Sequence, residues 1–158
     1  MKNTIAQAVI LAGGRGARLR PLTDSIPKPM APINGVPFLD YLISSIHNMG
    51  IKKILLLLGY KANVIADRYK KVKKPIIEFS YGDKDDQTGK RVINAYDQLD
   101  DYFFLMYGDN YWPIELDAML SNYQKLNTAV TTTVFSNKNG TGEYGFENND
   151  DITARTQV

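Results

Sequence analysis

The sequence predicts an α/β fold in which helices cover a mostly parallel β-sheet. Two observations carry this prediction: unbroken apolar runs, which are typical of buried parallel strands, and stretches of helical period between them. Parallel strands need long crossover connections, which are usually helices, so the alternation of strands and helices predicts a parallel sheet. With 158 residues, of which 44% are hydrophobic and 23% charged, the chain is long enough to bury one core. We therefore expect residues 1–158 to form a single domain.

The first third of the chain predicts one strand–helix–strand unit. Residues 6–11 contain the apolar run 8–11, and residues 53–58 contain a second one, 54–58, so both ranges are expected to be central strands. Between them Pro37 begins a helix that Gly50 ends. The apolar positions of this helix recur at helical spacing, at Leu39, Leu42, Ile43, Ile46 and Met49.

The remaining sequence continues the alternation. We expect a short helix near 63–69, a strand over 76–81, a helix near 91–99 and an interior strand over 102–106. Pro113 then leads a helix through Tyr123, and residues 129–135 suit a further strand. With right-handed crossovers these elements form a Rossmann-like three-layer sandwich. Ligands of such folds bind beyond the carboxyl ends of the strands.

Composition and charge argue against several classes of protein. The net charge of +2 is too small to indicate a nucleic-acid partner, and the lysine-rich run at 70–74 is interpreted as a solvated helix end before Pro75. The chain has no cysteine, which excludes disulfides and thiol chemistry. No apolar run approaches membrane-spanning length, and residues 1–20 lack the core of a signal peptide. We expect a cytoplasmic protein without nucleic-acid or membrane partners; the sequence predicts no oligomeric state.

A glycine- and arginine-rich segment follows the first predicted strand. Residues 13–29 read G-G-R-G-A-R-L-R-P-L-T-D-S-I-P-K-P. Glycine lets the backbone approach a ligand and turn N–H groups toward phosphate oxygens, while arginine and lysine neutralise their charge. A triphosphate is the ligand that suits such a loop. The segment is not a P-loop, because Lys28 lies far from the glycines, and Leu19 replaces the third glycine of a dinucleotide fingerprint.

This segment resembles the signature of the sugar nucleotidyltransferases, G-G-x-G-T-R-L-x-P-L-T-x-x-x-P-K-P. It matches at every fixed position except Ala17, which replaces a threonine. The resemblance implies a fold of the nucleotide-diphospho-sugar transferase type. It also implies a magnesium-dependent reaction in which a nucleoside triphosphate and a sugar 1-phosphate give an NDP-sugar and pyrophosphate. A non-catalytic nucleotide or nucleotide-sugar binding homologue is the alternative.

The resemblance also implies roles for individual residues. Arg18 and Lys28 would contact the phosphates and carry catalysis, because transfer between phosphates needs charge neutralisation and positioning rather than a protein nucleophile. Asp109, in the pair Gly108-Asp109 after a predicted strand, would ligate Mg²⁺; a turn aspartate that caps the next helix is the other interpretation. His47, the only histidine, is interpreted as structural or exposed. The residues expected to bind nucleotide or sugar are Leu11, Ala12, Gly13, Gly14, Gly16, Thr88, Gly89 and Gly145.

Two stretches conflict on the base, and the C-terminal part departs from the family pattern. Residues 87–91, Q-T-G-K-R, are more like the cytidylyltransferase branch, whereas residues 27–42 look most like heptose 1-phosphate and mannose 1-phosphate guanylyltransferases. The base therefore stays open. After Tyr144-Gly145 the usual Glu-Lys motif and second metal aspartate are missing, so the chain resembles a family core that lacks its C-terminal third. We expect this form to bind nucleotide and to turn it over poorly.

Overall fold

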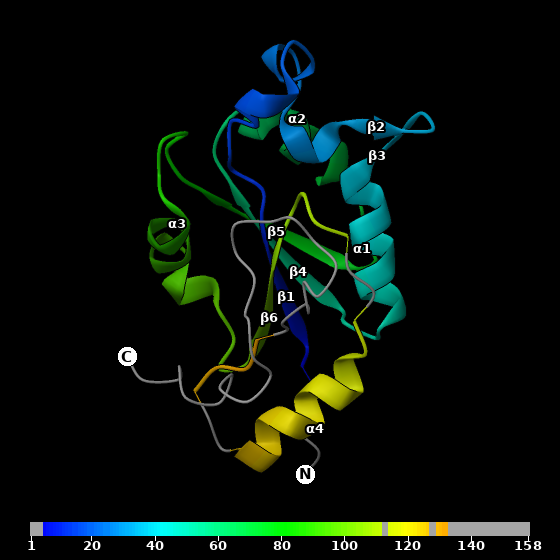
Figure 1. Cartoon of the computed structure of the whole chain (residues 1–158), viewed down its shortest axis with the longest axis vertical. Helices are drawn as coiled ribbons and strands as arrows, with labels where there is room; N and C mark the ends of the chain where they lie inside the picture. Colours follow the sequence, from blue (N-terminus) through cyan, green and yellow to red (C-terminus); the bar gives the residue numbers. More distant parts are fainter. Residues whose placement is uncertain (1–4, 112–113, 127–128, 133–158) are drawn as a thin grey trace, which may run out of the picture. The chain divides into compact units, whose positions relative to one another are not determined.

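The computed structural model describes residues 5–111, 114–126 and 129–132. The chain divides into two compact units, Met1–Tyr111 and Trp112–Val158, and each is described by itself. The first unit is built on a four-stranded sheet, in the order β5-β4-β1-β6, whose strands are all parallel (Figure 1). Its strands are β1 (Gln7–Leu11), β4 (Lys53–Leu58), β5 (Ile76–Tyr81) and β6 (Phe103–Tyr107). The predicted α/β, Rossmann-like fold is therefore confirmed.

Helices lie on both faces of this sheet. They are α1 (Phe38–Asn48), α2 (Ala62–Tyr69) and α3 (Thr88–Asn94), and Figure 1 shows α1 and α3 on opposite sides of the strands. Because they cover two faces, β1 and β4 are buried on both sides, as their unbroken apolar sequences require. On one face Val9, Leu55 and Leu57 pack with Ala95, which follows α3.

The first crossover helix, α1, has the predicted amphipathic pattern. Its buried side chains are Leu39, Leu42, Ile43 and Ile46. Gly50 follows the helix with φ +88°, a conformation that costs glycine little and other residues more. The predicted start at Pro37 and end at Gly50 therefore agree with the structure.

The strand order reverses between β1 and β6. From β1 the chain moves outward through β4 to β5, and it then returns across the sheet to place β6 on the other side of β1. The carboxyl ends of β1 and β6 meet closely, because the Gly108 N–H donates to the Leu11 carbonyl at 2.9 Å. A Cβ on Gly108 would lie 2.9 Å from the same oxygen, so this junction requires glycine. Such a reversal is where open α/β sheets form ligand crevices.

Several local predictions were wrong. The helix expected over 91–99 begins earlier, as α3, and is followed by the 3₁₀ turn η4 (Tyr96–Gln98), because Gln87 is extended and the helical turn starts directly after it. The proline-rich segment 27–32 contains the 3₁₀ turn η3 (Lys28–Met30). Within the described residues β6 is an edge strand rather than an interior one, and Leu105 and Tyr107 are 43% and 54% exposed.

A short hairpin and a fourth helix complete the described elements. The hairpin of β2 (Pro32–Ile33) and β3 (Val36–Pro37) turns at Asn34-Gly35, both at positive φ, as this dipeptide favours. In the second unit α4 (Leu116–Leu126) covers much of the expected helix, while Pro113 lies outside the described residues. Of the strand expected over 129–135, residues 129–132 are not in a strand and the rest lie outside the described residues. None of the described helices combines the length and apolar character that crossing a membrane requires.

Candidate functional site

A pocket of about 320 Å³ lies at the carboxyl ends of β1 and β6, where the strand order reverses. This volume falls within the range of small-molecule sites. The predicted site residues that line it come from β1, the glycine-rich loop, the start of α3 and the segment after β6. They are Leu11, Ala12, Gly13, Gly14, Gly16, Arg18, Lys28, Thr88 and Asp109.

The glycine-rich loop is fixed at both ends of its glycine run. The Ala12 N–H donates to the Leu57 carbonyl at 3.0 Å, and the Gly13 carbonyl accepts from the Tyr60 N–H at 3.0 Å. Gly16 has φ +61°, in the left-handed region that glycine adopts at little cost. Its carbonyl accepts the Thr23 hydroxyl at 3.0 Å, and Thr23 is itself 1% exposed. Contacts within the protein therefore define the path of this loop.

Two 3₁₀ turns continue this loop, η1 (Ala17–Leu19) and η2 (Leu22–Asp24). Of the three arginines, Arg15 precedes η1, Arg18 lies within it and Arg20 directly follows it. Arg15 pairs with Asp85 at 2.6 Å, and this hydrogen bond holds the pKa of the Asp85 carboxyl below its ordinary value. Arg20 pairs with Asp24 at 3.2 Å.

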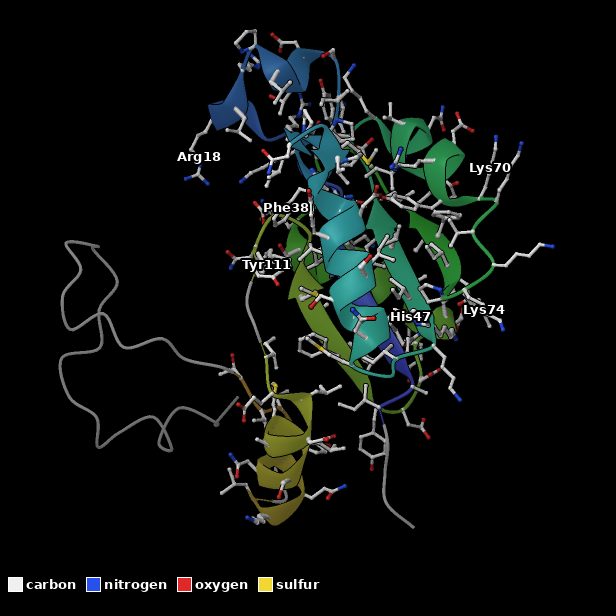
Figure 2. The ribbon with its side chains drawn as sticks, turned by 90° about the vertical axis from the view of Figure 1, so that its right-hand side faces the viewer. Arg18, Phe38, His47, Lys70, Lys74 and Tyr111 are labelled. Atoms are coloured by element: carbon white, nitrogen blue, oxygen red, sulfur yellow. The ribbon has the colours of Figure 1, made fainter. Side chains whose placement is uncertain are left out.

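Arg18 differs from its two neighbours. It projects from η1 in Figure 2 and forms no ion pair within the described part of the chain, although it lines the pocket. Of the loop's arginines, Arg18 is therefore the one whose guanidinium is placed to meet an anionic ligand.

Lys28 and Asp109 meet in the pocket. The Lys28 Nζ lies 2.6 Å from Asp109 Oδ2, and both side chains are partly exposed, at 29% and 39%. Lys28 belongs to η3, whereas Asp109 follows β6, 81 positions later in the chain. The fold thus brings the predicted phosphate cation and the predicted metal carboxylate into direct contact. Asp109 does not cap α4, which begins only at Leu116.

The pocket offers a metal ion a single carboxylate from the predicted set. Among the described residues there is no group of three or more histidine, cysteine, aspartate or glutamate side chains that could hold a metal ion together. Mg²⁺ needs no such group, because it keeps several waters and often takes one or two carboxylates together with phosphate oxygens of the substrate. Asp109 therefore fits a magnesium ion that a nucleotide brings with it.

Five lining residues of this pocket were not among the predicted site residues: Ala17, Pro29, Asp86, Arg91 and Tyr107. Arg91 is the one of them whose charged side chain is buried. Its side chain lines the pocket and is only 6% exposed. It donates to the carbonyls of Leu58 and Gly13, at 2.9 and 3.1 Å, and to that of Asp83 at 2.9 Å. Apart from the basic pair after Thr88-Gly89, no local pattern indicates this role.

Two residues considered from the sequence, Gly89 and His47, do not line the pocket, and for a third, Gly145, no position is described. Gly89 neighbours Thr88 but does not line the pocket, and a Cβ on it would meet open space. Gly145 lies outside the described residues. His47 is exposed on α1, and Figure 2 shows it well apart from Arg18. The interpretation of His47 as an exposed residue agrees with this position.

Comparison with protein families and curated proteins gives consistent matches. A family model described as nucleotidyl transferase matches residues 7–154. A D-glycero-alpha-D-manno-heptose 1-phosphate guanylyltransferase of Campylobacter jejuni is 34% identical over 125 residues, covering 78% of this chain and 57% of that protein. The bifunctional protein GlmU of Methanocaldococcus jannaschii is 39% identical over 113 residues, covering 72% of this chain and 27% of that protein. The chain thus spans only part of the length of these relatives.

Solved structures share the fold. HddC from Yersinia pseudotuberculosis, in a crystal structure complexed with GMP-PN, has a TM-score of 0.67 and 31% identity, and the match covers 75% of this chain and 54% of HddC. A UDP-glucose pyrophosphorylase complexed with UDP-glucose has the same TM-score, 0.67, at 20% identity, over 79% of this chain and 55% of that one. At that identity the second match bears on the fold alone.

Proposed function

Because the chain belongs to the nucleotidyl transferase family, we propose that it forms an NDP-sugar and pyrophosphate from a nucleoside triphosphate and a sugar 1-phosphate. The observation that carries this proposal is the pocket at the β1–β6 reversal, which gathers the glycine-rich loop, Arg18, Lys28 and Asp109. This combination of backbone, two cations and one carboxylate suits a magnesium-bound triphosphate better than a neutral ligand.

The proposed reaction is a displacement at the α-phosphorus. A phosphate oxygen of the sugar 1-phosphate forms a new bond to that phosphorus, while the bond from it to the bridging oxygen of the β-phosphate breaks. Pyrophosphate leaves with the electron pair of the broken bond. No protein nucleophile is needed, so the protein contributes positioning and charge neutralisation.

The roles of the two cations follow from their positions. Arg18 carries a planar fork that can bind two oxygens of one phosphate, and it is without a carboxylate partner in the described part of the chain. Lys28 supplies a compact charge on the pocket wall beside Asp109. We propose that Arg18 orients the triphosphate and that Lys28 approaches the phosphate that reacts.

We propose that Asp109 holds the Mg²⁺ of the magnesium–nucleotide complex. When bound, this ion would neutralise charge on the phosphate oxygens and so favour departure of pyrophosphate. The carboxylate sits directly after β6, a strand that pairs with β1 over five register positions, and this gives it a stiff support. Lys28 would then exchange its carboxylate partner for phosphate oxygen.

The test begins with binding. A thermal-shift panel of ATP, CTP, GTP, UTP and dTTP, each with and without magnesium, should identify at least one stabilising triphosphate. The panel includes every common base because the two stretches of sequence that bear on the base, 27–42 and 87–91, conflict. Failure of all five to stabilise the protein or to bind by calorimetry would refute the proposal.

Turnover separates catalysis from simple binding. Pyrophosphate release should appear when the best triphosphate is combined with a panel of sugar 1-phosphates. Arg18→Met should weaken triphosphate binding about tenfold to a hundredfold, which is what loss of a charge-assisted hydrogen bond costs. Arg20→Met is the matched control, since Arg20 does not line the pocket, and it should leave binding unchanged. Binding without turnover on any sugar 1-phosphate would favour the non-catalytic nucleotide-binding homologue.

A further inference from the structure

Arg91 is a buried cation without a carboxylate partner. Among the described residues it is the one charged side chain that is buried. No ion pair joins it to a carboxylate in the described part of the chain, and its hydrogen bonds go to backbone carbonyls instead. Burying a charge is costly unless its hydrogen bonds are satisfied. A side chain held in this way needs an explanation beyond a contribution to the core.

The guanidinium ties together the ends of three neighbouring strands. Nη1 donates to the Leu58 carbonyl at the end of β4. Nη2 donates to the Gly13 carbonyl after β1 and to the Asp83 carbonyl after β5, and it lies 3.4 Å from the Lys84 oxygen. These strands are adjacent in the order β5-β4-β1. One rigid fork therefore fixes the relative positions of three loops at the carboxyl edge of the sheet.

Two glycines leave the space that this fork occupies. A Cβ on Gly13 would lie 2.2 Å from Arg91 Nη1, and a Cβ on Gly59 would lie 2.3 Å from the same atom. Neither position could carry a larger residue unless the guanidinium moved. In contrast, a Cβ on Gly14 would meet nothing within 4 Å. The first glycine of the loop is therefore explained by Arg91, and the second faces open space.

The hydrogen bond to Gly13 also orients the next N–H group. The Gly13–Gly14 peptide is trans, since the described cis bonds precede Pro21 and Pro75 only. In a trans peptide the carbonyl and the following N–H point in opposite directions. Because the Gly13 carbonyl points at the guanidinium, the Gly14 N–H points away from it. The Tyr60 N–H donates to the same carbonyl at 3.0 Å, so Arg91 and Tyr60 together hold the direction of a donor in the loop that lines the pocket.

We propose that Arg91 is a positioning residue for the phosphates of the nucleotide, an inference that rests on the proposed function. It acts in two ways. It holds the Gly13–Gly14 peptide so that its N–H meets phosphate oxygen, and it keeps behind the loop a positive charge that forms no ion pair in the described part of the chain, the nearby Asp86 carboxylate of the same pocket included. Carbonyl dipoles solvate this charge but do not cancel it, so its field reaches an anion in the pocket. The benefit should grow with the number of phosphates on the ligand.

The test compares affinities along a phosphate series. Calorimetry would measure the nucleoside, monophosphate, diphosphate and triphosphate of the base that best stabilises the wild-type protein in the five-nucleotide panel. Arg91→Met keeps the aliphatic stem and removes the charge and the fork. We expect it to weaken triphosphate binding about tenfold to a hundredfold, with smaller losses for fewer phosphates and almost none for the nucleoside. Lys90→Met removes the same charge from the neighbouring exposed position and should change none of the four affinities.

A role confined to the fold gives a different pattern. If Arg91→Met lowers the melting temperature but leaves triphosphate affinity unchanged, or weakens all four ligands equally, the proposal is wrong. If Arg91→Met does not fold, Arg91→Lys and Gly59→Ala take its place: the first keeps the charge without the fork, and the second keeps the arginine but displaces its guanidinium. Triphosphate affinity equal to wild type in these two folded variants would overturn the proposal.

The outcomes for the wild-type protein separate this inference from the proposed function. Triphosphate binding without turnover would refute the catalytic proposal and leave the phosphate series as the test of Arg91. Absence of binding by every triphosphate in the panel would overturn both.

Discussion

Lys28 Nζ lies 2.6 Å from Asp109 Oδ2, so the proposed phosphate cation and the proposed metal ligand form an ion pair with each other. The pair crosses the point where the strand order reverses, with Asp109 after β6 and Lys28 in the segment that follows β1. A triphosphate that recruits Lys28 must release Asp109, and a metal ion that recruits Asp109 must release Lys28. The two ligands should therefore bind better together than either does alone.

The first prediction concerns Asp109→Asn. Without magnesium, this variant should bind triphosphate about threefold to tenfold more tightly than wild type, because a carboxylate that repels phosphate and occupies Lys28 is gone. With magnesium, the gain in affinity that wild type shows should disappear. Calorimetry with magnesium and with EDTA measures both effects.

The stability of Asp109→Asn is its control. A partly exposed ion pair contributes about 0–1 kcal/mol, so the melting temperature should change by only a few degrees. A large loss of stability with intact magnesium dependence would instead make Asp109 a structural turn residue.

Lys28→Met is the second prediction. Methionine keeps the length of the aliphatic stem, but it removes the charge and leaves Asp109 without its cation. Triphosphate affinity should fall at least about tenfold, and more steeply at low ionic strength, where charges are screened less. Lys52→Met provides the matched control, since Lys52 is exposed and does not line the pocket. Equal affinities for wild type and Lys28→Met would rule out a phosphate contact by Lys28.

The third prediction uses two glycines at positive φ. Gly16 has φ +61°, and a Cβ there would lie 2.7 Å from Lys28 Cβ; Gly50 has φ +88°, and a Cβ there would meet nothing within 4 Å. Gly16→Ala and Gly50→Ala should each cost about 1–2 kcal/mol of conformational strain. Only Gly16→Ala should also displace Lys28 and weaken triphosphate binding.

Urea denaturation and calorimetry on the same two variants separate the strain from the displacement. Gly16→Ala should lose at least as much stability as Gly50→Ala, because its Cβ also meets Lys28, and binding should be reduced in Gly16→Ala alone. Equal affinities in both variants would show that the position of Lys28 does not depend on Gly16.

The parts of the fold that the sequence predicted best are those that local pattern determines. The strands over 53–58 and 76–81 were predicted to the residue. The first is a continuous apolar run after Lys53, and the second follows Pro75 and alternates apolar and polar residues from Ile77 to Ser80. The start of α3 was not, since residues 87–91 have no strong capping signal and only the N-cap geometry of Gln87 marks the boundary. The Asn34-Gly35 hairpin turn was readable from its dipeptide and was overlooked.

The candidate site likewise has residues that local sequence could predict and one that it could not. The loop and Asp109 could be predicted because their residues are contiguous or directly follow a strand, and the pocket brings them together. Arg91 could not, because its acceptors lie 8, 33 and 78 positions away in the chain. Only the strand order places those three carbonyls around one guanidinium. No local pattern encodes that convergence.

The last prediction concerns the contact between α1 and α2, away from the pocket. Asp40 of α1 accepts hydrogen bonds from Arg68 and from the buried Tyr69, both of α2. Burial raises the pKa of Asp40, but the hydrogen bonds from Arg68 and Tyr69 outweigh it and place the pKa below the ordinary value of 3.8. Burial, followed by the bond to Asp40, raises the pKa of the Tyr69 phenol, so this hydroxyl stays a donor at neutral pH.

The sign of the pH effect follows from the lowered pKa of Asp40. A group whose pKa falls on folding stabilises the protein above its unfolded pKa, and that stability is lost as the pH falls through the folded value. Asp40→Asn should therefore lower the free energy of unfolding by about 1 kcal/mol near pH 7, and the difference from wild type should shrink as the pH falls below about 4. Asp67→Asn, at an exposed position of α2 paired with Lys70, is the control and should have almost no effect. Urea denaturation across this pH range measures the free energy of unfolding of both proteins. If wild type stays more stable than Asp40→Asn by the same amount at low pH, the shape of the side chain, and not its charge, holds α1 against α2.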